Sequence, residues 1–407
     1  MKKTRILINI SVKNHINTFL SFFNKAKDQD LFLNKLKSFL KKNNLLIHSQ
    51  GRVSLYNLML NIIKTKKNEV LLSPYTLYEV VNAIRYAGGK CVFVDLDERT
   101  GLPNEDLIDK KISDNTAAIL ITHLFSKEKD LLRFEKKYSG KIKIIEDTAI
   151  NFGAKLSDGR NLGTIFDYGF YSFGLMKVLT TYHGGALYIR DNYEYKNFYN
   201  NNNQTIPYPK KKIISLYFFS ILINFFYNKY IFKYFTYYFI WYFTKNKIKF
   251  FEKIIFPGLN PKISNIVPEY FKYEFCKNFN LIGLENIDDV TTQLNSRREI
   301  VGFYEKYINK KLLITNFDFY DVNAFLEFPI LLKKNTSKFI SEKLLNEGYD
   351  VRHTFYPNIS KYFDNFDNEK YPICERFENY ILSLPTNSNF DQKDCKKICE
   401  IINQFEN

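Results

Sequence analysis

The stretch IIEDTAINFGAKLSDGRNLGTIFDYGFYSFGLMKVLTTYHGGA, residues 144–186, decides the fold of this chain. It begins as a short apolar strand that ends in the carboxylate of Asp147. Ser172 lies five residues before Lys177, and a Gly-Gly pair follows near the end of the stretch. The 30 residues from Asp147 to Lys177 leave room for two further strands, so both side chains can reach one pocket.

Apolar runs alternate with helix-length segments on the N-terminal side of this stretch. Strand-like runs lie at 70–75, 91–97, 117–125 and 141–149, and the helical run 80–89 ends in glycine. This β-α-β alternation predicts a mixed, mostly parallel sheet flanked by helices, an α/β fold. We expect functional side chains at the strand ends and in the loops that follow them.

The chain divides into four predicted segments. Residues 1–45 include apolar side chains at helical spacing and predict an N-terminal amphipathic helical segment. Residues 46–209 form a large domain, and residues 210–250 form an apolar helical insertion. Residues 251–407 alternate helical stretches with short strands and predict a smaller α+β C-terminal domain.

Charge and cysteine content limit the functional class. The net charge of +16 favours anionic partners such as nucleic acid, membrane surfaces or phosphorylated substrates. Because the lysines are spread along the chain and no recognition motif is apparent, we expect no specific nucleic-acid binding. The five cysteines are odd in number and contain no CxxC pair, which suggests neither a disulfide framework nor a metal site. A reducing cytoplasm fits best, and no secretory signal is evident.

Residues 213–243 read IISLYFFSILINFFYNKYIFKYFTYYFIWYF, an almost continuous apolar and aromatic tract flanked by lysines. Asn224, Asn228, Lys229 and Lys233 interrupt it, so each uninterrupted piece is shorter than the roughly 20 residues of a membrane span. We expect a pair of helices in one leaflet, with Tyr and Trp side chains at the interface and lysines reaching lipid phosphates. The alternatives are a single span, or an insertion packed against its own domain or across a dimer interface.

Asp147, Ser172 and Lys177 supply the groups that pyridoxal 5′-phosphate (PLP) requires. The cofactor needs a lysine amine for a Schiff base and proton transfer, and a carboxylate that keeps its pyridine nitrogen protonated. Its phosphate needs hydrogen-bond donors. The sequence therefore predicts Lys177 as the catalytic Schiff-base lysine, Asp147 as the partner of the ring nitrogen and Ser172 as a phosphate ligand.

These motifs resemble the DegT/StrS family of fold type I PLP enzymes, most of which are sugar aminotransferases. The family's E-D-x-A motif falls at 146–149, its S-F-x-x-x-K segment at 172–177 and its G-G-A at 184–186. The resemblance covers roughly residues 45–407 without the apolar tract. It implies a fold type I aminotransferase that cycles between PLP and its amine form PMP, and that works as a homodimer.

The resemblance also implies cofactor contacts outside the central stretch. The segment SQGRVSLYNLML resembles the loop-to-helix turn that binds the phosphate through backbone amides, which implies this role for Gly51, Arg52 and Val53. Residues 258–264, GLNPKIS, resemble the segment that reaches the partner subunit's site. This match would place Asn260 on the other chain's phosphate.

Three positions depart from the family pattern. The aromatic residue that stacks on the pyridine ring falls at Leu77, with Tyr75 or Tyr78 as substitutes. Many members have glutamine at the position of Ile150, and a glutamate follows the lysine where this chain has His183. Leu77 is thus expected at the cofactor, and Tyr75 and His183 at the substrate.

Two further residues are candidates by position. His123 ends the strand 117–125 on the same edge as Asp147, so it either lines the pocket and contacts the cofactor or serves as a structural histidine. Arg352, in DVRHTFYP, lies where the C-terminal domain of this fold approaches the substrate. We predict that it binds the donor's carboxylate or a substrate phosphate.

Transamination is the expected reaction. By resemblance, glutamate donates an amino group and a keto-sugar of glycan or lipopolysaccharide-type biosynthesis accepts it. Relatives that dehydrate sugars lack the lysine, so Lys177 favours transamination. The apolar tract favours an enzyme on the inner face of the cell membrane with a lipid-linked substrate. The alternatives are a soluble nucleotide-sugar aminotransferase that uses the tract for dimer packing, and a non-catalytic PLP-binding regulator or scaffold.

Overall fold

A seven-stranded sheet forms the centre of the structure, a computed structural model that describes residues 2–23, 30–125, 127–201, 205–246, 248, 262–313, 322–363 and 369–405. Its spatial order is β1-β7-β6-β5-β4-β2-β3. The strands are β1 Leu45–His48, β2 Glu69–Leu72, β3 Lys90–Phe93, β4 Thr116–Thr122, β5 Lys143–Asp147, β6 Tyr168–Ser172 and β7 Gly185–Ile189. Because β7 is antiparallel to β1 and β6 while the other pairs are parallel, the predicted mixed, mostly parallel sheet is confirmed.

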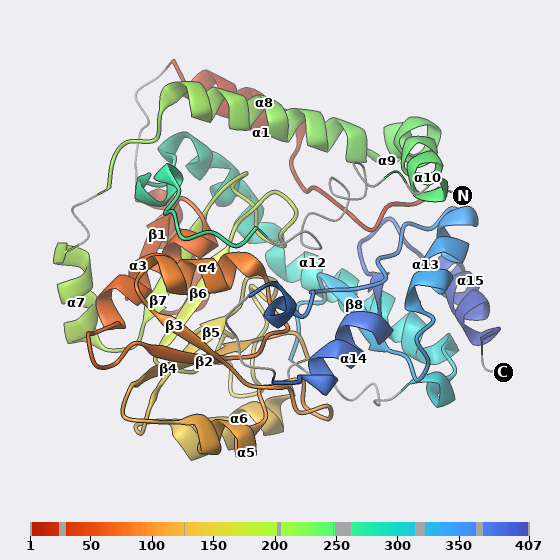
Figure 1. The fold of residues 1–407 in the computed structure, drawn as a ribbon. Helices are drawn as coiled ribbons and strands as arrows, with labels where there is room; N and C mark the ends of the chain where they lie inside the picture. Colours follow the sequence, from red (N-terminus) through yellow and green to blue (C-terminus); the bar gives the residue numbers. More distant parts are fainter. Residues whose placement is uncertain are drawn as a thin grey trace.

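Helices cover both faces of this sheet (Figure 1). Along β2, Val70 and Leu72 join the core beneath α3 Gly51–Ile62 and α4 Tyr78–Tyr86, whereas Leu71 joins the core on the other face. That second face packs against α2 Leu31–Leu40, α5 Glu105–Lys111 and α6 Glu128–Tyr138. Burial on both faces explains why the strands read as continuous apolar runs.

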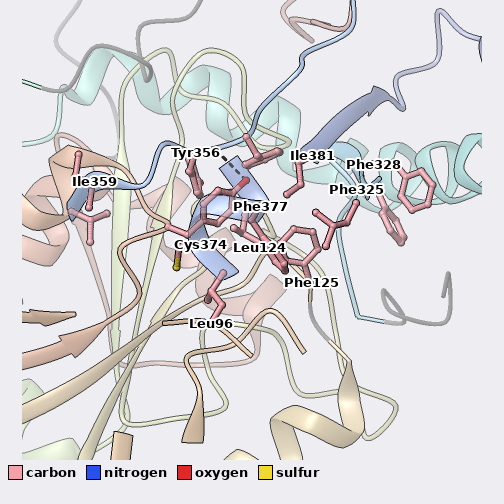
Figure 2. Close-up of a cluster of buried hydrophobic side chains, with 14 of the residues drawn as sticks. Leu96, Leu124, Phe125, Phe325, Phe328, Tyr356, Ile359, Cys374, Phe377 and Ile381 are labelled. Atoms are coloured by element: carbon pink, nitrogen blue, oxygen red, sulfur yellow. Dashed lines mark hydrogen bonds between the residues drawn. The ribbon is translucent and has the colours of Figure 1, made fainter. Parts of the chain in front are cut away.

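The C-terminal part is a smaller α+β unit, as predicted. Its two antiparallel strands are β8 Glu327–Leu331 and β9 Ile381–Pro385. Its helices are α12 Asn280–Tyr307, α13 Ser337–Asn346, α14 Pro372–Tyr380 and α15 Gln392–Asn403. One buried cluster contains Leu96 and Phe125 from the large domain together with Phe328 and Phe377 from this unit, as Figure 2 shows. The two predicted domains therefore share a core, which fixes the loops between them.

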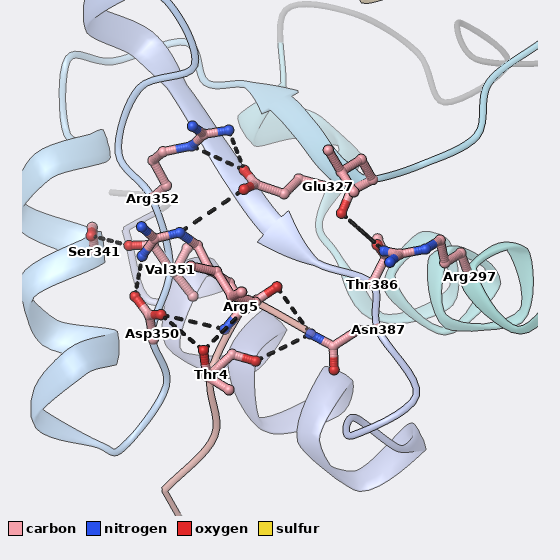
Figure 3. Close-up of polar contacts among 12 residues, drawn as sticks. Thr4, Arg5, Arg297, Glu327, Ser341, Asp350, Val351, Arg352, Thr386 and Asn387 are labelled. Carbon is pink, nitrogen blue, oxygen red and sulfur yellow. Dashed lines mark hydrogen bonds and ion pairs between the residues drawn. The ribbon is translucent and has the colours of Figure 1, made fainter. Parts of the chain in front are cut away.

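The N-terminal residues cross the C-terminal unit, which the sequence did not predict. Lys3 forms a parallel bridge with Tyr349, and Asn387 donates to the carbonyl oxygens of Thr4 and Arg5 (Figure 3). The chain then enters α1 Val12–Ser21, which Ser11 caps by accepting from the amide of Asn14. Residues 3–5 are thus tied to the C-terminal unit before the chain enters α1.

The apolar tract folds as a pair of helical arms, as predicted. The first arm is α8 Lys210–Tyr227, which ends at Asn228. The second comprises α9 Lys229–Ile231, a π-helical turn at Phe232–Thr236 and α10 Tyr237–Lys245. Within the described part of the chain, no helix combines the length and hydropathy that a membrane crossing requires. Helix α7 Asn192–Asn201 precedes the tract at the edge of the sheet.

Candidate active site

Asp147 lies at the carboxyl end of β5, in the middle of the sheet. It pairs with Thr122 of β4 on one side and with Phe170 of β6 on the other. Its Oδ1 accepts a hydrogen bond from the amide of Ala149 at 3.0 Å. The side chain is almost fully buried, and burial raises the pKa of Asp147, while the Ala149 amide and the charge of Lys177 lower it. The carboxylate is therefore a buried charge that a cationic partner would stabilise.

Lys177 lies in a tight loop between β6 and β7. The amide of Phe173 donates to Gly184 O at 2.8 Å, and the amide of Thr181 donates to Phe173 O at 3.0 Å. A methyl group placed on Gly174 would be 3.8 Å from Ser172 Oγ and 4.0 Å from Lys177 Cγ. Ser172 and Lys177 thus flank one small space beside Asp147's strand.

The electrostatic environment prepares Lys177 for nucleophilic chemistry. Burial lowers the pKa of Lys177 from 10.5 to about 8. The negative charge of Asp147 raises this pKa, whereas the positive charges of Arg352 and Arg52 lower it. A lysine with a pKa near 8 is uncharged in about a tenth of the molecules at pH 7, far more than an ordinary lysine, and the neutral amine is the form that acts as nucleophile and general base.

The N-terminus of α3 meets Ser172 at the same edge. A Cβ added to Gly51 would lie 2.9 Å from Tyr171 O and 3.0 Å from Ser172 Cβ, so this approach requires glycine. Gly185 is equally constrained, because its Cβ would lie 2.4 Å from the amide nitrogen of Gly51. The first amides of a helix have no intrahelical partners and can donate to a ligand. In α3 these amides lie beside Ser172.

Unpaired buried hydroxyls show that this edge fits a phosphorylated cofactor. Ser49 Oγ, just before α3, and Thr76 Oγ1, just before α4, are buried and have no hydrogen-bond partner among the described residues. The two helix starts are joined by an ion pair of 3.2 Å between Arg52 Nη1 and Glu79 Oε1. These residues therefore fit a bound phosphate, and the buried Asp147 carboxylate fits a protonated ring nitrogen.

Two predicted contacts need correction. The amide of Val53 already donates to Gln50 O at 3.1 Å and its side chain is buried in the core, so Val53 offers no free donor. Tyr75 is buried too, with its ring packed edge-on against Tyr356 and Phe377. Its hydroxyl accepts from the amide of Tyr356 at 3.4 Å. Tyr75 lies in the loop after β2, and Tyr356 and Phe377 of the C-terminal unit fill the space around its ring. The side chain therefore cannot reach the substrate.

His123 lies beneath the site rather than at its surface. Its ring is fully buried, and Nε2 shares a hydrogen bond of 3.0 Å with Glu146 Oε2. Glu146 also accepts from the amides of Gly163, Ile165 and Phe166. The structure therefore supports the structural alternative for His123, which helps Glu146 to hold the loop before β6.

Leu77, Tyr78 and His183 are the remaining candidates, and Tyr78 and His183 lie within reach of the charge of Arg52. Leu77 is half-buried directly before α4, and Tyr78 begins that helix. Burial and the Glu79 charge raise the pKa of Tyr78 to about 12, while Arg52 lowers it. Burial and the Arg52 charge lower the pKa of His183 to about 4, so its imidazole is neutral at physiological pH. These three residues stay candidates for ring and substrate contacts.

Arg352 belongs to an ion-pair network that sequence reasoning missed (Figure 3). Its Nε and Nη2 donate to Glu327 Oε2 at 3.0 and 2.8 Å, and its guanidinium lies 4.4 Å from the ring centroid of Phe355. The buried Arg5 pairs with Asp350 and lies 3.9 Å from Glu327. The position of Glu327 within a predicted strand was a signal that this charge has a partner. Nothing in the sequence, however, connects Arg5 with Glu327.

Tyr356 is a second residue that the sequence did not single out. It is buried at the junction of the two domains (Figure 2), where burial and the charge of Asp147 raise its pKa and Arg352 lowers it. Tyr356 is thus close enough to both Asp147 and Arg352 for their charges to act on its hydroxyl. Asn260, predicted to reach the partner subunit, lies outside the described residues.

The chain matches the sequence profile of the DegT/DnrJ/EryC1/StrS aminotransferase family over residues 17–216 and 271–403. The match stops within α8 and resumes after the tract, so the rest of α8 and the arm that ends in α10 lie between the two matched segments. GDP-perosamine synthase of Escherichia coli O157:H7 is 25% identical over 365 residues, which is 88% of this chain and 84% of that protein.

Another relative and two solved structures are also similar to this chain. A UDP-4-amino-4,6-dideoxy-N-acetyl-beta-L-altrosamine transaminase of Campylobacter jejuni is 23% identical over 343 residues, covering 81% of this chain and 77% of that protein. Helicobacter pylori PseC, an aminotransferase involved in pseudoaminic acid biosynthesis, shares the fold with a TM-score of 0.74 at 16% identity over 100% of both chains. The PLP form of the sugar aminotransferase Spr1654 from Streptococcus pneumoniae, described as putative, superposes with a TM-score of 0.70 at 15% identity, covering 98% of this chain and 97% of that one.

The profile match extends over most of the chain and includes Asp147, Ser172 and Lys177. The structure shares its fold with the solved relatives over nearly the whole chain. The chain therefore belongs to the DegT/DnrJ/EryC1/StrS aminotransferase family and is a PLP-dependent sugar aminotransferase of fold type I.

Proposed function

We propose that this enzyme transfers an amino group from glutamate to a keto-sugar, with Lys177 as the catalytic residue. The observation that carries the proposal is the electrostatic coupling of Lys177 and Asp147 in one buried site, beside Ser172 and the start of α3. An acid, an amine of lowered pKa and a phosphate cradle at one strand edge are what this chemistry needs.

Each residue has a separate task in holding the cofactor. Bound PLP supplies an electron sink that stabilises negative charge on the substrate carbon. Asp147 would keep the pyridine nitrogen protonated, since a buried carboxylate gains most from a cationic partner. Ser172, the amides of Gly51 and Arg52, and from the partner subunit Asn260 would bind the phosphate. Leu77 would face the ring where relatives place an aromatic residue.

Lys177 Nζ would move the proton in both halves of the reaction. Its lowered pKa lets the neutral amine remove the proton from the amino-bearing carbon of the donor. In the second half the ammonium returns a proton to the sugar carbon. His183 and Tyr78 lie near Arg52 and would orient the substrate through hydrogen bonds.

Arg352 would bind the carboxylate of the amino donor. Both of its hydrogen bonds to Glu327 use Nε and Nη2, and its charge reaches Lys177. Glu327 thereby fixes the plane of the guanidinium through Nε and Nη2, and Nη1 takes no part in this contact. A planar, pre-oriented guanidinium is well suited to a carboxylate.

The sugar carrier is proposed to be a lipid, and the enzyme to work on the inner face of the cell membrane. Two residues that flank Lys177, Leu175 and Tyr182, pack in one cluster with Tyr217 of α8, so the lysine loop adjoins the apolar helices. The named relatives use GDP-linked or UDP-linked sugars, which favours the alternative of a soluble nucleotide-linked substrate. In that case the tract would pack across the homodimer.

The test is an amino-transfer assay with the purified PMP form of the enzyme, in detergent. Lipid-linked and nucleotide-linked keto-sugars are offered separately, and conversion to the PLP form is followed by absorbance. Turnover of the lipid-linked sugar alone supports the proposed carrier, and turnover of the nucleotide-linked sugar alone supports the alternative. If neither reacts and glutamate fails to regenerate PMP, the chain is a PLP-binding regulator or scaffold, and the proposal is wrong.

A further inference from the structure

Helix α1 is oriented with its apolar side outward. Its buried residues are the polar Asn14, His15 and Thr18. Its apolar residues follow helical spacing and are between 41% and 75% exposed: Val12, Ile16, Phe19, Leu20 and, just beyond the helix, Phe23. An amphipathic helix in a water-soluble protein buries its apolar stripe, so this inversion means that the stripe faces something other than water.

The tract helices extend the same apolar surface. Phe218, Leu222 and Phe225 of α8 are each about half exposed, and α8 buries only Tyr217 and Ser220. The arm that ends in α10 exposes Phe235 and Phe239. Helices α1 and α8 run side by side along one edge of the molecule (Figure 1) and touch through Tyr217, which packs against Phe19 and Phe22. We call the exposed apolar side chains of α1, α8 and the α10 arm the apolar face.

The two segments that form the apolar face carry only positive charges of their own, although Glu269 pairs with Lys212 and Asp394 pairs with Lys3. Residues 2–23 and 205–246 contain no Asp or Glu, whereas lysines occur at 2, 3, 13, 210–212, 229, 233 and 245. Several of these lysines fold back over neighbouring rings. Lys229 lies 4.9 Å from the ring centroid of Tyr230, Lys233 lies 4.7 Å from Tyr234, and Lys245 lies 4.7 Å from Trp241. Lysine-aromatic pairs beside apolar helices are typical of the boundary between lipid tails and anionic headgroups.

A basic pocket lies at the end of this face. Lys2, Tyr237, Tyr238, Trp241, Lys245 and Asn346 line an open hollow of about 480 Å³. Lys2 Nζ lies 4.2 Å from the ring centroid of Tyr237, and the Trp241 indole donates to Asn346 Oδ1 at 2.7 Å. Two ammonium groups on an aromatic floor suit a headgroup phosphate.

We propose that the apolar face docks on an anionic lipid bilayer, with α1 and α8 lying in the interface and the flanking lysines on lipid phosphates. The proposal rests on the membrane location proposed above. It adds which surface docks, which class of lipid it binds and that α1 takes part in the contact. The absence of acidic residues from 2–23 and 205–246 favours a bilayer over a second copy of the chain. Lys3 and Lys212 are already paired with Asp394 and Glu269, and a self-complementary interface would bring the other lysines together without carboxylates from these two segments.

Vesicle co-sedimentation tests the docking surface. The holoenzyme is mixed with phosphatidylcholine vesicles with and without phosphatidylglycerol, at low and high salt. We expect binding to the anionic vesicles that weakens with salt. Replacing Lys210 and Lys211 with Gln should weaken binding by roughly fivefold per lysine. Ile16→Ser with Leu20→Ser, or Phe218→Ser with Leu222→Ser, should weaken it by roughly tenfold or more.

Matched controls lie on α6, at the opposite end of the molecule (Figure 1). Leu132→Ser removes an exposed apolar side chain there, and Lys129→Gln with Lys136→Gln removes two exposed charges. Both controls should bind vesicles as the unmodified chain does. If the α1 and α8 variants bound anionic vesicles as tightly as the unmodified chain does, the proposal would be overturned. Absence of vesicle binding together with an oligomer that these variants dissociate would also overturn it, because a second copy would then cover the face.

The proposed catalytic function can be tested independently of the docking surface. Lys177→Ala should bind vesicles fully while losing amino transfer. A chain that binds vesicles but transfers no amino group would refute the enzyme's proposed substrates and leave the docking surface standing. An active chain that ignores anionic vesicles would refute the docking surface alone.

Discussion

The hydroxyl of Tyr182 is hydrogen-bonded to Nδ1 of His15, which ties the loop of Lys177 to helix α1. Asn224 of α8 donates to Ile10 O at 2.9 Å and lies 2.8 Å from His15 Nε2. Because the Asn224 amide nitrogen donates to Nε2, the ring carries its proton on Nδ1 and donates to Tyr182. Burial lowers the pKa of His15, which keeps the ring neutral.

Tyr182→Phe should therefore destabilise the chain by about 1–3 kcal/mol, the usual cost of leaving one buried polar group without its partner. Tyr182 is fully buried and adopts a φ of 61°, so the ring must stay while the hydroxyl is removed. Urea unfolding measures the effect. Tyr199→Phe, at an exposed position on α7, is the control and should change stability by less than about 0.5 kcal/mol. Equal stability of both variants would contradict the structural role of this bond.

The pKa of Lys177 should move in opposite directions in two variants. Asp147→Asn removes a negative charge that raises this pKa, so it should fall below about 8. Arg352→Gln removes a positive charge that lowers it, so it should rise. Reductive methylation of the cofactor-free protein across a pH series, read by peptide mass spectrometry, gives the midpoint for Lys177. Because only the neutral amine reacts, labelling should reach half its maximum near pH 8 in the unmodified chain. Identical midpoints in all three proteins would show that these charges do not reach the amine.

Gly51→Ala should weaken PLP binding by roughly tenfold or more, the effect of losing one charge-assisted hydrogen bond. The added Cβ would meet Tyr171 O at 2.9 Å and push the start of α3 away from Ser172. Gly302→Ala is the matched control, because nothing lies within 4 Å of its Cβ in α12. That control should bind PLP normally and be more stable by up to about 1 kcal/mol, the helix preference for alanine. Fluorescence titration of the apoenzyme with PLP compares the two. Unchanged affinity in the Gly51 variant would place the phosphate elsewhere.

Arg352→Lys should raise the KM for glutamate by roughly tenfold or more, since a lysine cannot replace a planar bidentate contact. The first half-reaction is followed by absorbance as PLP converts to PMP. The second half-reaction does not involve the donor, so its rate with the keto-sugar should stay close to that of the unmodified chain. Arg376→Lys, in an exposed ion pair with Glu98, serves as the control. If the sugar half-reaction slows and the glutamate KM stays constant, Arg352 binds the sugar substrate instead.

The sequence predicted the sheet well because its signals are local. Strands buried on both faces read as apolar runs, and the glycines that let α3 approach β7 occur within recognisable motifs. It also placed Asp147 and Lys177 in one site, since both follow neighbouring strands. Contacts made over a long sequence separation were missed. The Arg5–Glu327–Arg352 network joins three distant segments, and Tyr75 is buried because the C-terminal unit covers it. The inverted orientation of α1 was also invisible, because an amphipathic pattern does not say which face packs inward.

The central claim is that Lys177 is the lysine that binds the cofactor covalently. Borohydride reduction of the PLP-loaded enzyme, followed by peptide mass spectrometry, tests it directly. We predict a pyridoxyl group on the peptide that contains Lys177, and no stable label or amino transfer in Lys177→Ala. A pyridoxyl group on another lysine, or full activity of Lys177→Ala, would contradict the assignment.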